Sequence, residues 1–118
     1  MRNKMLMVAK MKNEKLKRKI QNSDYPAFYK QVWLECLKIK KGHLSTYSEI
    51  ARRIGKPKSA RAVGNALAKN PFAPEVPCHR VIRKNGKLGG YSKGLKQKLR
   101  LLTNEKKNSI IIYRKIYG

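Results

Sequence analysis

The chain has 118 residues, which is enough for one domain with one modest core. Its 30 Lys and Arg far outnumber its six Asp and Glu, and the net charge of +24 predicts attraction to polyanions, namely DNA, RNA, ribosomes or anionic membrane surfaces. No apolar run approaches the roughly 20 residues of a membrane span. The apolar patch 5–9 is too short, and too closely followed by lysines, for a secretory signal.

The first 22 residues carry eight of the basic residues and a single Glu. This segment is either a solvated, frayed basic arm or a weak amphipathic helix, and the sequence leaves both interpretations open. We therefore expect a basic N-terminal arm over 1–22 and a compact domain over 23–118.

The compact domain is expected to begin near residues 23–26, where Ser, Asp and Pro are typical of a helix N-terminus. Apolar residues then recur with the i, i+3, i+4, i+7, i+8 spacing of one helix face. This face consists of Tyr29, Val32, Trp33, Cys36 and Leu37. The pattern predicts that Cys36 is an ordinary core residue. A disulfide between Cys36 and Cys78 is formally possible, but nothing in the sequence indicates an extracellular disulfide framework.

Two short helices are predicted next. Residues 46–49 indicate a capping box, in which Thr46 caps the helix and Glu49 reaches back. That helix is expected to end at the Gly and Pro of positions 55 and 57, and Ser59 then begins a second helix that ends before Asn70. Two short helices joined by a Gly-containing turn predict a helix-turn-helix.

The second helix of this pair, 59–68, carries small residues on nearly every face. Such a helix can pack tightly against a neighbouring helix, or approach a nucleic-acid groove closely, and the two interpretations are compatible. Arg61 is the only long side chain in its first two turns.

After residue 80 the pattern changes to short strands. The run 81–84, the Asn-Gly at 85–86 and the pair 87–88 predict a hairpin with a type I′ turn, which would form a wing after the helix-turn-helix. Leucines at 95, 99 and 102 indicate a last helix with Glu105 near its end, followed by a short apolar tail at 110–113. The fold class is thus mainly α: a winged-helix-like DNA-binding domain with a helix-turn-helix and a small two-stranded hairpin.

The most informative chemistry is the pair Cys78-His79, which follows Pro77 and precedes Arg80. A cysteine is a nucleophile as its thiolate, which nearby cations favour. Adjacent Cys and His alone are usually coincidence, and two Cys and two His lack the spacing of a zinc site. Together with the helix-turn-helix, the wing and the charge, however, the pair indicates chemistry on a nucleic-acid base, which has to be flipped out of the duplex.

At this point the chain resembles a known family, the O6-alkylguanine-DNA alkyltransferases, also called methylated-DNA–protein-cysteine methyltransferases. The resemblance runs from about Phe28 to Glu105. It is carried by Thr46-Tyr47, Ala60-Arg61-Ala62-Val63-Gly64, Asn70-Pro71, Pro77-Cys78-His79-Arg80-Val81, Gly89-Gly90-Tyr91-Ser92-Lys93-Gly94-Leu95 and Leu101-Leu102-Thr103-Asn104-Glu105.

The resemblance implies a catalytic set of three residues. Cys78 would take an alkyl group from guanine O6 and keep it as a thioether, so that the protein is consumed. His79 would act as the base, through a water, and Glu105 would orient His79, as in a nucleophile–base–orienter triad. The resemblance implies no cofactor and no metal.

The resemblance also implies residues that hold the substrate. The flipped guanine and its phosphate would be contacted by Tyr47, Val81, Tyr91 and Ser92, with Asn70 bracing the loop between the recognition helix and the active site. DNA would be contacted by Tyr47, Ala60, Arg61, Gly64 and Arg80, with Arg61 filling the gap in the base stack.

Family members usually carry a further N-terminal α/β domain, whereas only a basic segment of about 25 residues precedes the match here. Related alkyltransferase-like proteins also lack that domain, but they have lost the cysteine. We therefore expect transfer to Cys78, with two alternatives: a lesion-binding protein with little transfer, and a basic architectural nucleic-acid binder. The expected partner is double-stranded DNA containing O6-alkylguanine, without a membrane. The protein is expected to be a monomer in the cytoplasm or nucleoid, or in the nucleus if the source is eukaryotic.

Overall fold

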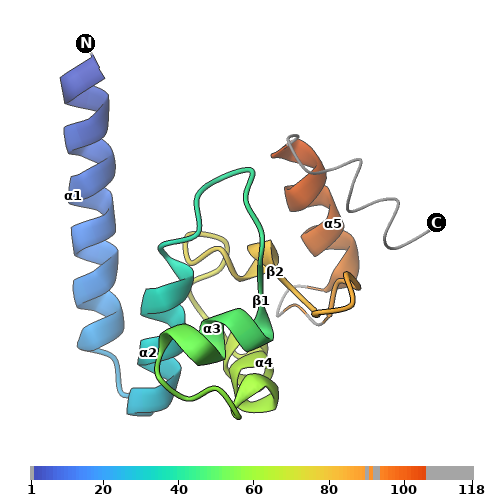
Figure 1. Ribbon diagram of the computed structural model, residues 1–118. Helices are drawn as coiled ribbons and strands as arrows, with labels where there is room; N and C mark the ends of the chain where they lie inside the picture. The colour runs from blue at the N-terminus through green and yellow to red at the C-terminus, as the bar shows by residue number, and fades with distance from the viewer. Residues whose placement is uncertain (1, 90, 92–93, 106–118) are drawn as a thin grey trace.

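A computed structural model describes residues 2–89, 91 and 94–105, and the side chains from Lys10 onward. The elements are α1 (Arg2–Gln21), α2 (Ala27–Cys36), β1 (Ser45–Thr46), α3 (Tyr47–Arg53), α4 (Ala60–Ala68), a 3-10 helix η1 (Cys78–Arg80), β2 (Val81–Ile82) and α5 (Leu95–Asn104). Figure 1 shows α1 at one side of the molecule and α5 at the other. The helices α2, α3 and α4 lie close together between them, and α1 contacts α2. The expected mainly α class is confirmed. No helix among the described residues is long and apolar enough to cross a membrane.

The core forms around the predicted face of α2. Val32, Trp33 and Cys36 are buried, and Tyr29 and Leu37 pack against them. Tyr25, Tyr29 and Phe72 surround the Trp33 ring at centroid distances of 4.9, 5.8 and 5.7 Å. The indole nitrogen donates to the Ala66 carbonyl of α4 at 2.9 Å, so that Trp33 ties α2 to the second helix of the helix-turn-helix.

The basic segment before residue 22 is helical, as one of the two interpretations held. Its last turns join the core, because Ile20 is fully buried and Leu16 packs against the same cluster. The boundary at residue 22 stays a prediction, but the contacts of α1 extend the packed core to at least Leu16.

Ile20→Ala is therefore expected to destabilise the protein by about 2–5 kcal/mol, the usual effect of removing a large aliphatic side chain from a packed core. A matched control is Met11→Ala on the same helix, since Met11 is 59% exposed. Urea unfolding of the three proteins measures the difference. Equal midpoints for Ile20→Ala and the parent would mean that α1 contributes nothing to the core.

The helix-turn-helix is α3 and α4. Thr46 caps α3 by accepting from the Glu49 amide at 3.1 Å, but the Glu49 carboxylate binds Arg52 and Arg53 rather than reaching back, so only half of the expected capping box is present. The C-terminal end of α3 has Gly55 at φ +77°, its amide bonded to the Arg52 carbonyl and the Lys56 amide bonded to the Ala51 carbonyl. This hydrogen-bond pattern is a Schellman motif, which explains why the helix ends at a glycine.

Ser59 stands at the N-cap position of α4 without capping it. Its hydroxyl donates to the Lys56 carbonyl at 2.6 Å and so stabilises the turn between the helices instead. On α4 the buried side is Val63, Ala66 and Leu67, while Arg61 is exposed. The small residues of α4 thus serve tight packing, as one of the two expectations held.

The two-stranded sheet differs from the expected hairpin. β1 and β2 pair in parallel, with Ser45 opposite Val81 and Thr46 opposite Ile82. The turn after β2 is also shifted: the Gly86 amide donates to the Arg83 carbonyl, the Arg83 amide donates to the Lys87 carbonyl, and Gly86 has φ +87°. A turn centred on 84–85 followed by a left-handed glycine makes a three-residue loop rather than a two-residue type I′ turn. The wing is therefore a loop. β2 pairs instead with β1, the two residues that directly precede α3.

The last helix, α5, forms as expected. Leu102 is buried and Leu99 partly so, but Leu95 is 55% exposed and lies outside the core. Glu105 stands at the C-cap position, where its side chain turns back toward η1. The expected apolar tail 110–113 lies outside the described residues.

Candidate active site and nucleic-acid interface

Cys78 begins the short 3-10 helix η1 and is almost completely buried, at 2% exposure. Asn70, just after the C-terminal end of α4, donates from Nδ2 to the Cys78 Sγ at 3.2 Å and to the Val76 carbonyl at 3.1 Å. Its Oδ1 accepts from the Phe72 amide at 2.8 Å. Asn70 thus braces the loop 70–78 and also contacts the sulfur, and a donor aimed at sulfur favours the thiolate.

His79 lies beside Cys78 with its two ring nitrogens in different surroundings. Nε2 is 2.7 Å from Oε1 of Glu105. A carboxylate can only accept, so Nε2 carries the proton and Nδ1 keeps a free electron pair. Nδ1 is buried and has no protein partner within hydrogen-bond distance among the described residues. The ring is therefore held in the tautomer that can accept a proton.

Arg80 completes this cluster. Its guanidinium contacts both oxygens of Glu105, with Nε at 3.0 Å from Oε1 and 2.7 Å from Oε2, and Nη2 at 2.7 Å from Oε2. Nη1 donates to the Ile39 carbonyl at 2.7 Å. The structure thus gives Arg80 internal partners, whereas the sequence led us to expect a DNA contact.

Burial shifts the pKa values of the His79 imidazole and of the second thiol, Cys36, in opposite directions. Burial lowers the pKa of His79 below its ordinary value of 6.5, against the opposing effect of Glu105, so the ring is neutral at pH 7. Burial raises the pKa of the Cys36 thiol well above its ordinary value of 9.0, and the charge of Cys78 adds to this effect. Cys36 is therefore a protonated core thiol, as its place on the α2 face predicted.

The other predicted guanine contacts lie near the same cluster where the structure describes them. Val81 is fully buried, and the Tyr91 ring stands edge-on to the His79 ring at 6.3 Å between centroids. The Tyr91 hydroxyl is buried without a partner among the described residues, and burial raises the pKa of Tyr91 to about 12. Ser92 lies outside the described residues.

Sequence reasoning missed Lys98, which is fully buried in α5. Its Nζ donates to the Val81 carbonyl at 2.7 Å and to the Leu88 carbonyl, so it ties both ends of the wing to α5. It also lies 5.8 Å from the centre of the Tyr47 ring. Its spacing of four residues from the buried Leu102 places Lys98 on the same helix face, but a lysine there is ordinarily assigned to solvent.

Lys98 makes the stability of the protein depend on pH in a defined window. Burial lowers its pKa to about 8 in the folded state, against 10.5 ordinarily. Between these values the unfolded chain binds more protons, so the free energy of unfolding contributed by Lys98 rises from pH 8 to pH 10.5. Lys98→Met removes this contribution. From pH 8 to pH 10.5 we expect the unfolding free energy of the parent to rise relative to that of Lys98→Met. Urea unfolding of both proteins at each pH measures this difference. A difference that stays constant with pH would contradict the buried charge.

The predicted DNA contacts gather around an open groove of about 510 Å³ between α3, α4 and the wing. Its lining includes four predicted residues, Tyr47, Ala60, Arg61 and Gly64. It also includes residues that the sequence did not indicate, namely Ser48, Asn65, Ala68, Arg83 and Lys84. The two exposed cations of the wing could have been suggested by charge alone, but their place opposite Arg61 depends on the fold.

Tyr47 lines this groove, with its ring between two glycines. A Cβ at Gly64 would lie 3.9 Å from the Tyr47 ring, whereas a Cβ at Gly89 would lie 2.8 Å from Cε2 and overlap it. Gly89 also has φ +69°, a conformation that side chains disfavour. The close approach of the Gly89 backbone to the Tyr47 ring thus requires a glycine.

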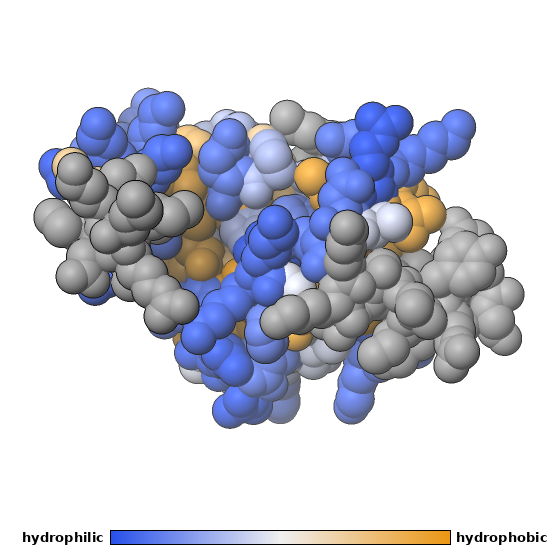
Figure 2. Space-filling view, turned by 90° about the horizontal axis from the view of Figure 1, so that it is seen from above, coloured by the Kyte–Doolittle hydropathy of each residue, from blue (hydrophilic) through white to orange (hydrophobic). Residues whose placement is uncertain are grey.

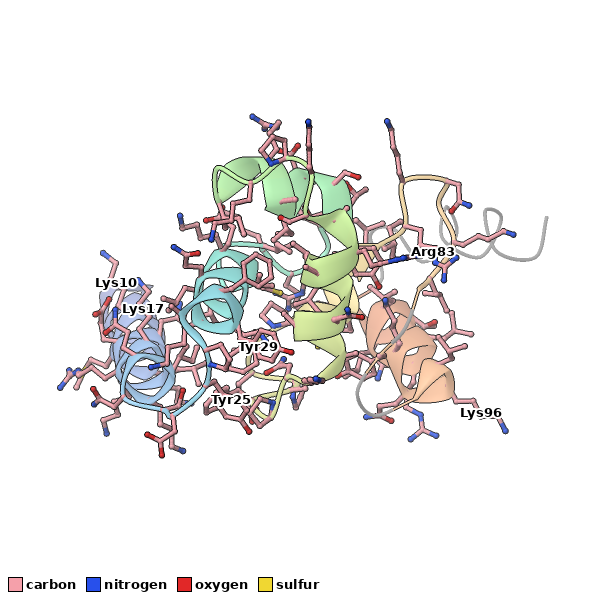
Figure 3. The ribbon with its side chains drawn as sticks, turned by 90° about the horizontal axis from the view of Figure 1, so that it is seen from below. Lys10, Lys17, Tyr25, Tyr29, Arg83 and Lys96 are labelled. Atoms are coloured by element: carbon pink, nitrogen blue, oxygen red, sulfur yellow. The ribbon has the colours of Figure 1, made fainter. Side chains whose placement is uncertain are left out.

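Basic residues lie on opposite sides of the molecule rather than on one side only. Figure 2 shows hydrophilic side chains along the upper and lower edges of one face, with apolar groups between them. In Figure 3, Lys10 and Lys17 of α1 lie at one side, and Arg83 and Lys96 lie at the other. Charge alone therefore does not single out the groove among the surfaces of the described residues.

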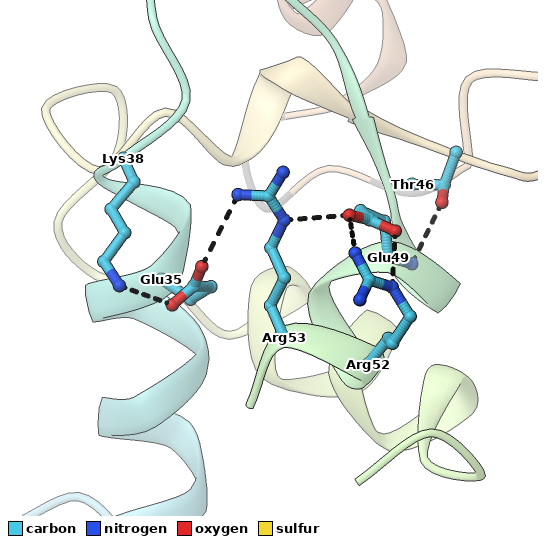
Figure 4. Close-up of polar contacts among 6 residues, drawn as sticks. All are labelled: Glu35, Lys38, Thr46, Glu49, Arg52 and Arg53. Carbon is cyan, nitrogen blue, oxygen red and sulfur yellow. Dashed lines mark hydrogen bonds and ion pairs between the residues drawn. The ribbon is translucent and has the colours of Figure 1, made fainter. Parts of the chain in front are cut away.

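A second cavity of about 560 Å³, between α2, α3 and the loop 37–46, contains two of the six acidic residues of the chain. Glu35 binds Lys38 at 2.9 Å and lies 3.9 Å from Arg53, and Glu49 binds Arg52 and Arg53 (Figure 4). Hydrogen bonds from the two arginines lower the pKa of Glu49 to about 2. Because Lys38 and Arg53, two of the cations that line it, are already paired with carboxylates, this cavity is a poor site for phosphate.

The fold and these contacts define a helix-turn-helix domain with a Cys–His–Glu cluster and a groove between α3, α4 and the wing. The family model for the DNA binding domain of 6-O-methylguanine DNA methyltransferase matches residues 27–107. The chain belongs to this family.

Two curated relatives show how much of the chain is shared. A methylated-DNA–protein-cysteine methyltransferase of Saccharomyces cerevisiae is 49% identical over 87 residues, which are 74% of this chain and 46% of the relative. One of Methanosarcina acetivorans is 54% identical over 78 residues, or 66% of this chain and 50% of the relative. The chain thus spans about half the length of the curated relatives it matches.

Solved structures agree. The Mycobacterium tuberculosis OGT in complex with DNA has a TM-score of 0.68 at 43% identity, covering 75% of this chain and 57% of that one. S. pombe Atl1, in complex with damaged DNA containing O6-carboxymethylguanine, has a TM-score of 0.62 at 35% identity, covering 70% and 79%.

Proposed function

We propose that the protein repairs DNA by moving an alkyl group from guanine O6 to Cys78 in a single, irreversible turnover. The observation that carries this proposal is the alignment of Asn70, Cys78, His79 and Glu105: a donor on the sulfur and an imidazole whose free nitrogen is unpartnered. The relatives named as methyltransferases support the same activity.

The chemistry follows from these contacts. His79 Nδ1, through a water, takes the proton of the Cys78 thiol, and Glu105 stabilises the resulting imidazolium. The thiolate attacks the alkyl carbon; the C–S bond forms as the C–O bond breaks, and the electron pair leaves with guanine O6. Guanine then takes up one proton, so charge is conserved. The thioether is a poor leaving group, which makes the reaction stoichiometric.

DNA would be held by the groove of α4 and the wing. Phosphate contacts by Arg83 and Lys84 would position the duplex, and Tyr47, which lines the groove, would contact the flipped nucleotide. Val81, Tyr91 and Ser92 remain the proposed walls of the base pocket. A monomer acting where DNA is kept, in cytoplasm, nucleoid or nucleus, is expected.

Binding of a lesion without transfer is the second candidate, favoured by the likeness to the S. pombe protein bound to damaged DNA. The presence of Cys78 inside the hydrogen-bonded cluster favours transfer instead. An architectural nucleic-acid binder would have no use for a buried Cys–His–Glu arrangement.

The deciding experiment incubates the protein with a duplex that contains one O6-methylguanine and records the intact mass. We expect each chain to gain the mass of one methyl group and then stop. An unchanged mass with tight binding of the lesion would favour the lesion-binding candidate.

Arg61→Ala tests the groove. Arg61 is exposed on α4 and reaches the groove, so we expect the variant to react far more slowly with duplex substrate and at an unchanged rate with free O6-benzylguanine, which needs no flipping. The rates are compared by single-turnover alkylation of Cys78. Equal losses on both substrates would show that Arg61 serves the packing of α4.

A further inference from the structure

The Glu105 carboxylate is shared by two partners, the neutral His79 ring and the Arg80 guanidinium, although its proposed role concerns only His79. His79 occupies Oε1, and Arg80 spans both Oε1 and Oε2 through Nε and Nη2. The side chains of Glu105 and Arg80 are 9% and 17% exposed, so the pair is held largely away from water. A two-pronged guanidinium contact fixes the plane of a carboxylate as no point charge can.

Arg80 is itself anchored from the far side. Its Nη1 donates at 2.7 Å to the carbonyl of Ile39, just beyond the C-terminal end of α2, a residue that packs against the core. The guanidinium therefore connects the core at α2 to the end of α5, where Glu105 stands. This anchor leaves little freedom for the guanidinium to turn outward to a DNA phosphate.

The charges that face His79 come from η1 and α5. Glu105, at the end of α5, favours the protonated ring, and Arg80 of η1 and Lys98 of α5 oppose it. Cys78 is its proposed reaction partner, and the Tyr91 ring lies 6.3 Å away between centroids. Burial is the main cause that lowers the pKa of His79, and Glu105 acts against it; Arg80 and Lys98 act in the same direction as burial, and a protonated imidazole cannot serve as a base. Arg80 is the only cation among the described residues that contacts Glu105.

We propose that Arg80 is a positioning residue of the active site: it fixes the Glu105 carboxylate for His79 and offsets its charge, so that His79 stays neutral and able to take the Cys78 proton. This inference rests on the proposed function, but the effect of Arg80 on the titration of His79 can be measured whether or not alkyl transfer occurs. It replaces the DNA contact that the sequence suggested for Arg80.

The test compares the parent with Arg80→Gln, which removes the charge, and Arg80→Lys, which keeps the charge but loses the two-pronged contact. Arg100→Gln is the matched control, because Arg100 is an exposed arginine of α5. The titration of His79 is followed by NMR, and the rate of Cys78 alkylation by free O6-benzylguanine is measured from pH 5 to pH 9. The free base removes any contribution of DNA binding.

In Arg80→Gln, the titration midpoint of His79 is expected to rise by about one pH unit, because the positive charge next to Glu105 is lost. The acid limb of the rate profile is expected to move by the same amount. Arg80→Lys is expected to keep the midpoint and to react more slowly at every pH. Arg100→Gln should match the parent in both measurements.

Three outcomes would overturn the inference: an unchanged His79 midpoint in Arg80→Gln; an Arg80→Lys variant with the full rate of the parent; or a loss confined to duplex binding, with a salt slope shallower by about one, which would make Arg80 a phosphate contact. If Arg80→Gln fails to fold, Arg80→Lys decides alone. Should the parent itself show no alkylation, the proposed function fails, while the midpoints still test the role of Arg80.

Discussion

Cys78→Ser is expected to abolish alkyl transfer completely, both from duplex O6-methylguanine and from free O6-benzylguanine. A serine hydroxyl has no accessible anion near neutral pH, and the His79–Glu105 pair cannot make an alkoxide as readily as a thiolate. Binding of the lesion-containing duplex should survive, because the groove residues are unchanged. Peptide mass mapping after reaction, alongside a gel-shift titration of the duplex, measures both properties.

The matched control is Cys36→Ser, which replaces the other thiol of the chain. Cys36 is fully buried on the α2 face, and burial raises its pKa, so it should carry no alkyl group in the parent. The variant should keep transfer and lose stability, by about 1–3 kcal/mol for a hydroxyl without assured partners. Alkyl found on Cys36, or repeated turnover by the parent, would contradict the assignment of Cys78.

The helices were the most predictable part of the fold, because their apolar spacing is local information. The face of α2 placed Trp33 and Cys36 correctly, and the Gly at position 55 marked the end of α3. The strand pairing was not predictable in this way. Asn-Gly at 85–86 favours a hairpin locally, but the parallel pairing of β1 with β2 joins residues about 36 positions apart, and this contact follows from packing.

The residues of the site likewise differ in whether local sequence or the folded chain determines their contacts. Cys78, His79 and Glu105 were expected together from motif resemblance, and the structure brings them together. Arg80 was expected at the DNA and is instead turned inward, because the Ile39 carbonyl and the Glu105 carboxylate lie beside it only in the folded chain. Lys98 was not expected at all, since a lysine between leucines is ordinarily assigned to a solvated face, and only the positions of the Val81 and Leu88 carbonyls explain its burial.

Glu105→Gln is expected to have the second largest effect, on both rate and stability. The glutamine amide is nearly the same size as the carboxylate, so the packing is kept and the charge is lost. Its NH₂ group can turn toward His79 Nε2 and donate, which the carboxylate cannot do. That contact favours the tautomer with the proton on Nδ1, and an Nδ1 that carries a proton cannot accept one from Cys78. We therefore expect a loss of about 10²-fold or more in the rate with free O6-benzylguanine.

The same substitution leaves the Arg80 guanidinium, which is 17% exposed, without its counterion. Breaking a largely buried pair by removing one charge costs about 3 kcal/mol, which urea unfolding measures. Glu14→Gln is the control: Glu14 is an exposed carboxylate of α1, 60% exposed and 3.4 Å from Lys17, and its loss should change neither property appreciably. A Glu105→Gln variant that reacts at the parent's rate would show that His79 needs no orienting partner, and the triad would reduce to Cys78 and the donor from Asn70. A variant that is slow but fully stable would instead locate the role of Glu105 in the tautomer of His79 rather than in the ion pair with Arg80.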